Sequence, residues 1–190
     1  ANNKYGVFPS VSLGWNVTNE NFMEDRPEWF DALKVRASWG KNGSDNIADF
    51  GYTSLTAMGN NILFGKTATK YNGSKAQRLA NPDLKWEETS MLNIGLDFQL
   101  FKGRLSGTIE WYSKQTKDML YTYTVPSPPY LYRSMMANVG DMSNKGIEVL
   151  LNFDAIKTKD FSWNTSLNLA HNKNEITKLS NDQFSTTRVY

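Results

Sequence analysis

Residues 91–113 form two alternating runs joined by a tight turn, and they constrain the fold more than any other stretch. In the first run every second residue is apolar, namely Leu92, Ile94, Leu96, Phe98 and Leu100. After residues 101–104 the alternation resumes, with Leu105, Ile109 and Trp111 on the apolar side. This period of two predicts an antiparallel hairpin with one apolar and one polar face. Each strand is about nine to eleven residues long, the length of a tilted strand that crosses a bilayer.

The composition excludes several classes of protein. Of 190 residues, 39 % are apolar and 13 % aromatic, which is enough to fold. The 21 basic and 19 acidic residues give a net charge of only +2, so no nucleic-acid partner is expected. The absence of cysteine excludes disulfides, thiolate catalysis and a cysteine zinc site. No apolar run reaches the length of a membrane-spanning helix. Barrel strands are not excluded, because their alternating apolar and polar residues give only a weak hydropathy signal.

Further alternating runs predict four more strands, at residues 5–17, 33–40, 147–153 and 161–170. Between them, residues 40–85 and 114–145 lack clear periodicity and are expected to be long loops, the first with an extended piece at residues 51–57. The second loop contains a proline cluster at residues 126–130, which a regular hydrogen-bond ladder does not accommodate.

The lengths of the connections carry the fold prediction. They run medium, long, short, long, short, so antiparallel neighbours place both long loops at one edge of the sheet. This asymmetry is typical of outer-membrane barrels, which have long extracellular loops and short periplasmic turns. The aromatic residues near the strand ends fit the two interfacial girdles. The fold class expected is all-β, an antiparallel transmembrane β-barrel segment of about six strands. The alternative is a soluble β-sandwich, whose strands are usually shorter.

Several short motifs carry a family resemblance. The stretch 81–87 reads Asn-Pro-Asp-Leu-Lys-Trp-Glu and is followed by Asn-Ile-Gly-Leu-Asp-Phe at residues 93–98. The others are residues 5–12, 111–112 with 116–120, and 138–140 with 144–148. In this order and spacing the sequence resembles the barrel region of the SusC/RagA family of TonB-linked (TonB-dependent) outer-membrane transporters.

The resemblance implies a barrel of about 22 strands around an N-terminal plug, located in the bacterial outer membrane and energised through TonB. It implies import of glycans or peptides, with a SusD/RagB-like surface lipoprotein over the extracellular mouth and outer-membrane lipid around the wall. Residues 1–190 are then expected to be part of the barrel domain, with the plug, the TonB box and the remaining strands outside this chain. About six strands leave two unpaired edges, which lipid does not tolerate.

The sequence offers no catalytic constellation. Glu87 and Glu88 are neighbours in a strand and point to opposite faces, so they cannot cooperate as an acid and a base. The single histidine, His171, has no acidic residue at a spacing typical of a metal site or a triad. No phosphate-binding loop, zinc-protease motif or nucleophile elbow occurs. We therefore expect no enzyme, no cofactor and no metal.

Four tyrosines in the second long loop are the candidates for contact with substrate or with the lipoprotein: Tyr121, Tyr123, Tyr130 and Tyr132. Tyrosine combines a large apolar ring with a hydroxyl group, which suits stacking on sugars or packing on a protein. The alternative is that these rings only order the loop itself.

Two other functions stay open. One is a structural or adhesive outer-membrane barrel without transport, and the other is a soluble carbohydrate-binding β-sandwich. The sandwich places Leu96, Ile109, Val149 and Leu167 in a dry protein core, whereas the barrel turns them toward lipid.

Overall fold

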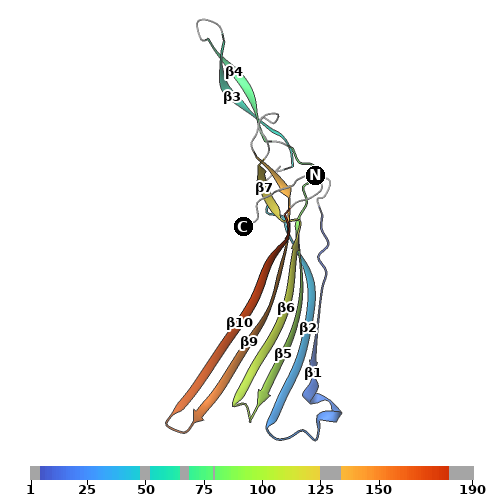
Figure 1. The fold of residues 1–190 in the computed structure, drawn as a ribbon, viewed down its shortest axis with the longest axis vertical. Helices are drawn as coiled ribbons and strands as arrows, with labels where there is room; N and C mark the ends of the chain where they lie inside the picture. Colours follow the sequence, from blue (N-terminus) through green and yellow to red (C-terminus); the bar gives the residue numbers. More distant parts are fainter. Residues whose placement is uncertain (1–4, 48–51, 65–68, 79, 125–133, 180–190) are drawn as a thin grey trace.

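The computed structural model describes residues 5–47, 52–64, 69–78, 80–124 and 134–179. Six long strands form one antiparallel sheet in the order β1-β2-β5-β6-β9-β10 (Figure 1). Their bounds are Ser10–Asn16 for β1, Phe30–Ser44 for β2, Glu87–Leu100 for β5, Leu105–Lys117 for β6, Asp141–Lys157 for β9 and Ser162–Lys178 for β10. None of the helices in these ranges has the length and apolar character needed to cross a membrane.

The register aligns the apolar positions of all six strands on one face. One row of directly paired residues runs across the whole sheet: Trp15, Val35, Leu96, Ile109, Val149 and Leu169. Much of this face is open, since Leu167 is 48 % and Leu169 56 % exposed. Within the described residues neither of the two small sheets packs on this face, which is the arrangement that the barrel predicts.

The apolar belt runs obliquely across the sheet. Its upper edge lies at Leu92 on β5, at Trp111 on β6, at Ile147 on β9 and at Leu169 on β10. Relative to the registered pairs, the upper edge lies four residues lower on β10 than on β5, which is roughly 13 Å along the strand direction. Three strand spacings of about 4.8 Å each separate these two strands. A belt of constant height therefore requires strands tilted by about 40°, which agrees with the tilt of transmembrane barrel strands.

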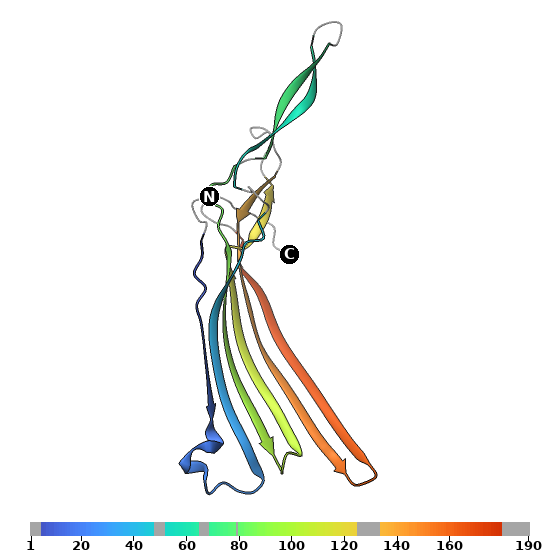
Figure 2. The same cartoon turned by 180° about the vertical axis from the view of Figure 1, so that it is seen from behind.

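The two ends of the sheet differ as the sequence predicts. The connections after β1, β5 and β9 lie at one end, and the two long ones lie at the other (Figure 2). The short end also carries aromatic residues, among them Trp15, Phe101 and Phe161. The turn between β5 and β6 holds Phe101, Lys102 and Gly103 at positive φ, and the N–H of Gly103 donates to Asp31 Oδ2 at 2.9 Å.

Two expectations about the long segments are wrong. Residues 40–85 contain a hairpin, β3 (Leu55–Phe64) with β4 (Thr69–Arg78), and residues 114–145 contain a shorter one, β7 (Leu120–Thr124) with β8 (Ser134–Asn138). The proline cluster lies outside the described residues. Both hairpins stand beyond the end of the main sheet (Figure 1), away from the apolar belt, where lipid does not enforce a period of two.

The strand lengths also differ from the sequence prediction. Strand β1 is shorter than residues 5–17, while β9 and β10 each reach 17 residues. The connection between the strands expected at residues 147–153 and 161–170 is shorter than predicted, because β9 continues to Lys157. Between β1 and β2 lie two short 3-10 turns, η1 (Val17–Asn19) and η2 (Asn21–Met23).

Candidate functional site

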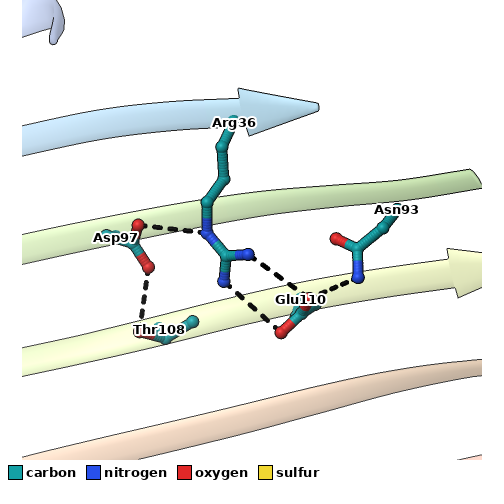
Figure 3. Close-up of polar contacts among 5 residues, drawn as sticks. All are labelled: Arg36, Asn93, Asp97, Thr108 and Glu110. Carbon is teal, nitrogen blue, oxygen red and sulfur yellow. Dashed lines mark hydrogen bonds and ion pairs between the residues drawn. The ribbon is translucent and has the colours of Figure 1, made fainter. Parts of the chain in front are cut away.

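The polar face of the sheet carries a network of charged side chains (Figure 3). Arg36 on β2 donates through Nε to Asp97 Oδ2 at 3.1 Å, and its Nη1 and Nη2 each lie 3.4 Å from a carboxylate oxygen of Glu110. Thr108 donates to Asp97 at 2.9 Å, and the Asn93 amide donates to Glu110. Three strands are thereby joined by side chains as well as by main-chain hydrogen bonds.

Gly95 makes this network possible. In the register, Arg36 lies opposite Gly95 and Gly95 lies opposite Glu110, so the guanidinium has to cross β5 to reach the second carboxylate. A Cβ atom on Gly95 would lie 2.8 Å from both Cζ and Nε of Arg36. Any larger residue at this position would therefore push the guanidinium away from Glu110.

The network is open to solvent and its strength is modest. The side chains of Arg36, Asp97 and Glu110 are 36 %, 35 % and 24 % exposed. Ion pairs with this much exposure contribute about 0–1 kcal/mol each. The network holds one basic and two acidic side chains together on the polar face of the sheet.

The same face is hollowed toward the short-turn end. The hollow has a volume of about 560 Å³. Its polar lining includes Asn16, Thr18, Lys34, Asp97, Gln99, Ser106, Thr108 and Asn152. Amides and hydroxyls in this density suit contact with water, with a polar solute or with another polar protein surface. The polar face is thus hollowed at this end, whereas the opposite face carries the apolar belt.

Asn138 joins the bases of the two long excursions above the sheet. Its side chain accepts from the N–H of Lys85 at 3.0 Å and donates to the carbonyls of Lys85 and Asp118, both at 2.8 Å. Asn138 is only 8 % exposed. A buried amide with these partners fixes the main chain of both excursions, because leaving any partner unpaired would cost free energy.

Neighbouring residues strengthen this junction. The Asn81 amide donates to the carbonyl of Met136 at 2.9 Å, and Lys85 Nζ lies 2.8 Å from Asp118 Oδ2. Leu84 is 2 % exposed and Ala137 1 % exposed. The motif at residues 81–87 and the motif at residues 138–140 thus meet in space and hold the excursions together.

The tyrosine candidates are only partly placed. Tyr121 lies on β7 and is 65 % exposed, so its ring is available to a partner. Tyr123 belongs to the same strand, with its main chain opposite Met135, and its side chain is not among those described. Tyr130 and Tyr132 lie outside the described residues. Their roles in binding stay predictions.

The sequence predicts no catalytic role for Glu87, Glu88 and His171, and each has an ordinary structural position. Glu87 accepts from the N–H of Leu120 at 3.3 Å, and Glu88 lies 3.6 Å from Lys41 Nζ. His171 lies opposite Ile147, in the row of the apolar face that also holds Trp111. The described residues contain no group of three histidine, aspartate or glutamate side chains that could hold a metal ion.

Sequence reasoning missed the Arg36 network and the junction at Asn138. A partial signal existed for the network, because Arg36, Asp97 and Glu110 all fall on the polar side of alternating strands. Their contact depends on the register, which alternation alone does not determine. Asn138 gave no signal beyond its motif, since its partners lie 20 and 53 positions away.

Together these features define a class of protein. One face is an apolar belt of membrane-spanning height, the other is concave and charged, and long excursions leave from one end only. This is a length of wall from an outer-membrane β-barrel. Over residues 1–189 the chain matches the family described as TonB dependent receptor-like, beta-barrel, and it belongs to that family.

Individual relatives agree with this assignment. The chain is 38 % identical over 179 residues to the TonB-dependent receptor SusC of Bacteroides thetaiotaomicron, covering 94 % of the chain and 18 % of SusC. It is 37 % identical over 189 residues to the TonB-dependent receptor P39 of Formosa agariphila, covering 100 % of the chain and 17 % of that receptor. The chain therefore spans less than a fifth of the length of these relatives.

Solved structures give the same result. The structure of the RagAB peptide transporter aligns with a TM-score of 0.81 and 29 % identity, covering 95 % of this chain and 19 % of the RagAB chain. The closed-closed state of the RagAB peptide importer aligns with a TM-score of 0.82, again at 29 % identity, over 96 % of this chain and 19 % of that one. The resemblance to SusC and RagA is confirmed, and the chain is a segment of a bacterial outer-membrane barrel.

Proposed function

We propose that this chain is part of the wall of a TonB-linked nutrient importer in the outer membrane. The observation that carries the proposal is the polar, charged inner face, with Arg36 between Asp97 and Glu110, on a sheet that belongs to the TonB-dependent receptor barrel family. A polar lumenal wall suits the passage of hydrophilic cargo or the seating of a polar plug. The role is transport, and no step of catalysis is assigned to these residues.

The domain organisation follows from this proposal. Residues 1–190 belong to the barrel domain, while a plug and a TonB box occupy other parts of a longer polypeptide. Support comes from the unpaired outer edges of β1 and β10, since an open edge is not tolerated in lipid and requires further strands.

The cargo is a glycan or a peptide, and a SusD/RagB-like lipoprotein closes over the mouth. The exposed ring of Tyr121 supports a contact role for the β7–β8 hairpin. We propose Tyr123, Tyr130 and Tyr132 as further contacts from the sequence alone. The junction at Asn138 holds this hairpin in place above the wall.

The test uses the full-length receptor and its neighbouring lipoprotein in a strain that lacks the native copy. Growth on glycans or peptides as sole nutrient, with and without TonB, measures energised uptake. Replacement of the four tyrosines by alanine is expected to slow growth without changing the amount of receptor in the membrane. The matched control is Tyr5→Ala, because Tyr5 is 95 % exposed and lies outside both excursions.

Growth that does not depend on the receptor or on TonB would refute import and would favour a structural or adhesive barrel. Growth that depends on both, but is unaffected by the four alanines, would refute only the tyrosine contacts.

A further inference from the structure

Three consecutive strands place a row of polar residues above the apolar belt, one outward position above its edge on β6 and β9 and two above it on β10. Ser113 on β6 lies directly opposite Lys145 on β9, and Lys145 lies directly opposite Lys173 on β10. By the alternation of the strands, all three side chains belong to the outward, lipid-side face. The row immediately below consists of Trp111, Ile147 and His171. The row therefore lies beyond the upper edge of the apolar belt on all three strands.

The pairing of two lysines needs an explanation. Like charges directly opposite one another on neighbouring strands are destabilising, and their Cβ atoms lie roughly 5 Å apart. Lys173 Nζ has one anionic neighbour, Glu175 Oε2 at 3.0 Å. In the described part of the chain no acidic side chain pairs with Lys145, so the cluster keeps one uncompensated positive charge.

The position of this row indicates which group can compensate the remaining positive charge. The long excursions lie on the same side of the belt, and long loops of such barrels are extracellular. Lipid headgroups lie there against the outer surface of the wall, whereas cargo passes on the other face. Lys145 is exposed, and Lys173 keeps 76 % of its side chain exposed despite its ion pair.

We propose that Ser113, Lys145 and Lys173 bind the phosphate group of a lipid headgroup in the outer leaflet. Two ammonium groups and a hydroxyl donor supply the charge and the hydrogen bonds that a phosphate accepts. Trp111 lies one row below, at the depth where indole rings anchor to the interface. This site lies on the outside of the barrel and goes beyond the proposed import.

The experiment uses the full-length receptor in phosphatidylcholine nanodiscs that contain a bisphosphorylated lipid A or its dephosphorylated form. Native mass spectrometry counts the lipid A molecules retained. We expect retention of the phosphorylated form to fall about fivefold for Lys145→Gln and about thirtyfold for the double variant with Lys173→Gln, because each cation near an anionic surface contributes about a factor of five. Glu175→Gln is expected to increase retention.

The matched control is Lys102→Gln, which removes an exposed lysine at the opposite end of the sheet. Equal retention of the dephosphorylated lipid would overturn the proposal, as would unchanged retention in the lysine variants. Binding of inorganic phosphate without retention of lipid A would assign the site to a free ion and would also overturn it. If the double variant fails to fold, the direction of the Glu175→Gln effect still decides.

Discussion

Substitution of Leu96 by arginine tests the orientation of the whole sheet. Leu96 belongs to the apolar row that crosses all six strands. On β5, two outward apolar residues lie above it, Leu92 and Ile94, and two lie below, Phe98 and Leu100. Leu96 is therefore at the middle of the belt, where a charge is farthest from water on either side.

The magnitude follows from this depth. The four residue steps from Leu96 to either edge of the belt span roughly 13 Å along the strand, or about 10 Å of depth at a tilt of about 40°. An arginine on the lipid face near the midplane destabilises a barrel by about 2–4 kcal/mol. This corresponds to a loss of roughly 30- to 700-fold in the folding equilibrium constant.

The assay is guanidinium unfolding of the full-length barrel in phosphatidylcholine vesicles, followed by tryptophan fluorescence and extrapolated linearly to zero denaturant. The matched control is Asn168→Arg, at an inward position directly opposite Leu150. We expect Asn168→Arg to lose little of the lipid contribution. Equal losses in free energy of unfolding for the two variants would contradict the assignment of faces and would remove the basis for a lipid belt.

Three further predictions address the polar contacts. Gly95→Val is expected to destabilise the barrel by no more than about 1 kcal/mol in the same assay, because its side chain would displace the flexible, partly exposed Arg36 guanidinium from Glu110. A double-mutant cycle of Arg36→Gln with Glu110→Gln should give a coupling of about 0.5–1 kcal/mol, and a value near zero would mean that the ion pair does not persist. Asn138→Leu removes the acceptor of the Lys85 N–H and leaves the carbonyls of Lys85 and Asp118 unpaired, so it should increase hydrogen exchange at the N–H of Lys85, with no change expected for Asn172→Leu.

The sequence was sufficient to predict the part of the fold that lipid controls. In the belt, each strand must present apolar residues to one side and polar residues to the other, so a period of two is enforced. The strands at residues 91–113, their faces and the side of each connection were therefore predictable. Within residues 147–153, Leu150 is the one apolar residue on the polar side.

The part outside the lipid was not predictable in the same way. Strands β9 and β10 continue far beyond their alternating cores because each supplies the other with a hydrogen-bond partner, as in the pair Asn144 and Asn174. Both faces meet water there, so the residue pattern carries no period. The β3–β4 hairpin was expected to be a loop for the same reason.

The candidate site also has a part that the sequence predicts and a part that it does not. The tyrosines were chosen because of their chemistry and their position near prolines, which a sequence displays directly. Arg36 and Glu110 are 74 positions apart, and only the register and the absence of a side chain at Gly95 bring them together. Side-chain contacts across three strands require knowledge of both neighbours, and a single sequence does not contain it.

The distribution of buried residues explains why Asn138 lies where it does. In the described residues only four apolar side chains are buried, and three of them, Leu84, Ala137 and Val139, lie at the junction above the sheet. Inside the membrane the wall needs no core of its own, because lipid covers one face and the ladders satisfy the main chain. Once the strands emerge into water, the excursions need burial to keep a fixed structure. A small apolar cluster with a satisfied amide beside it provides that burial, and it does so at the point where the two long excursions begin.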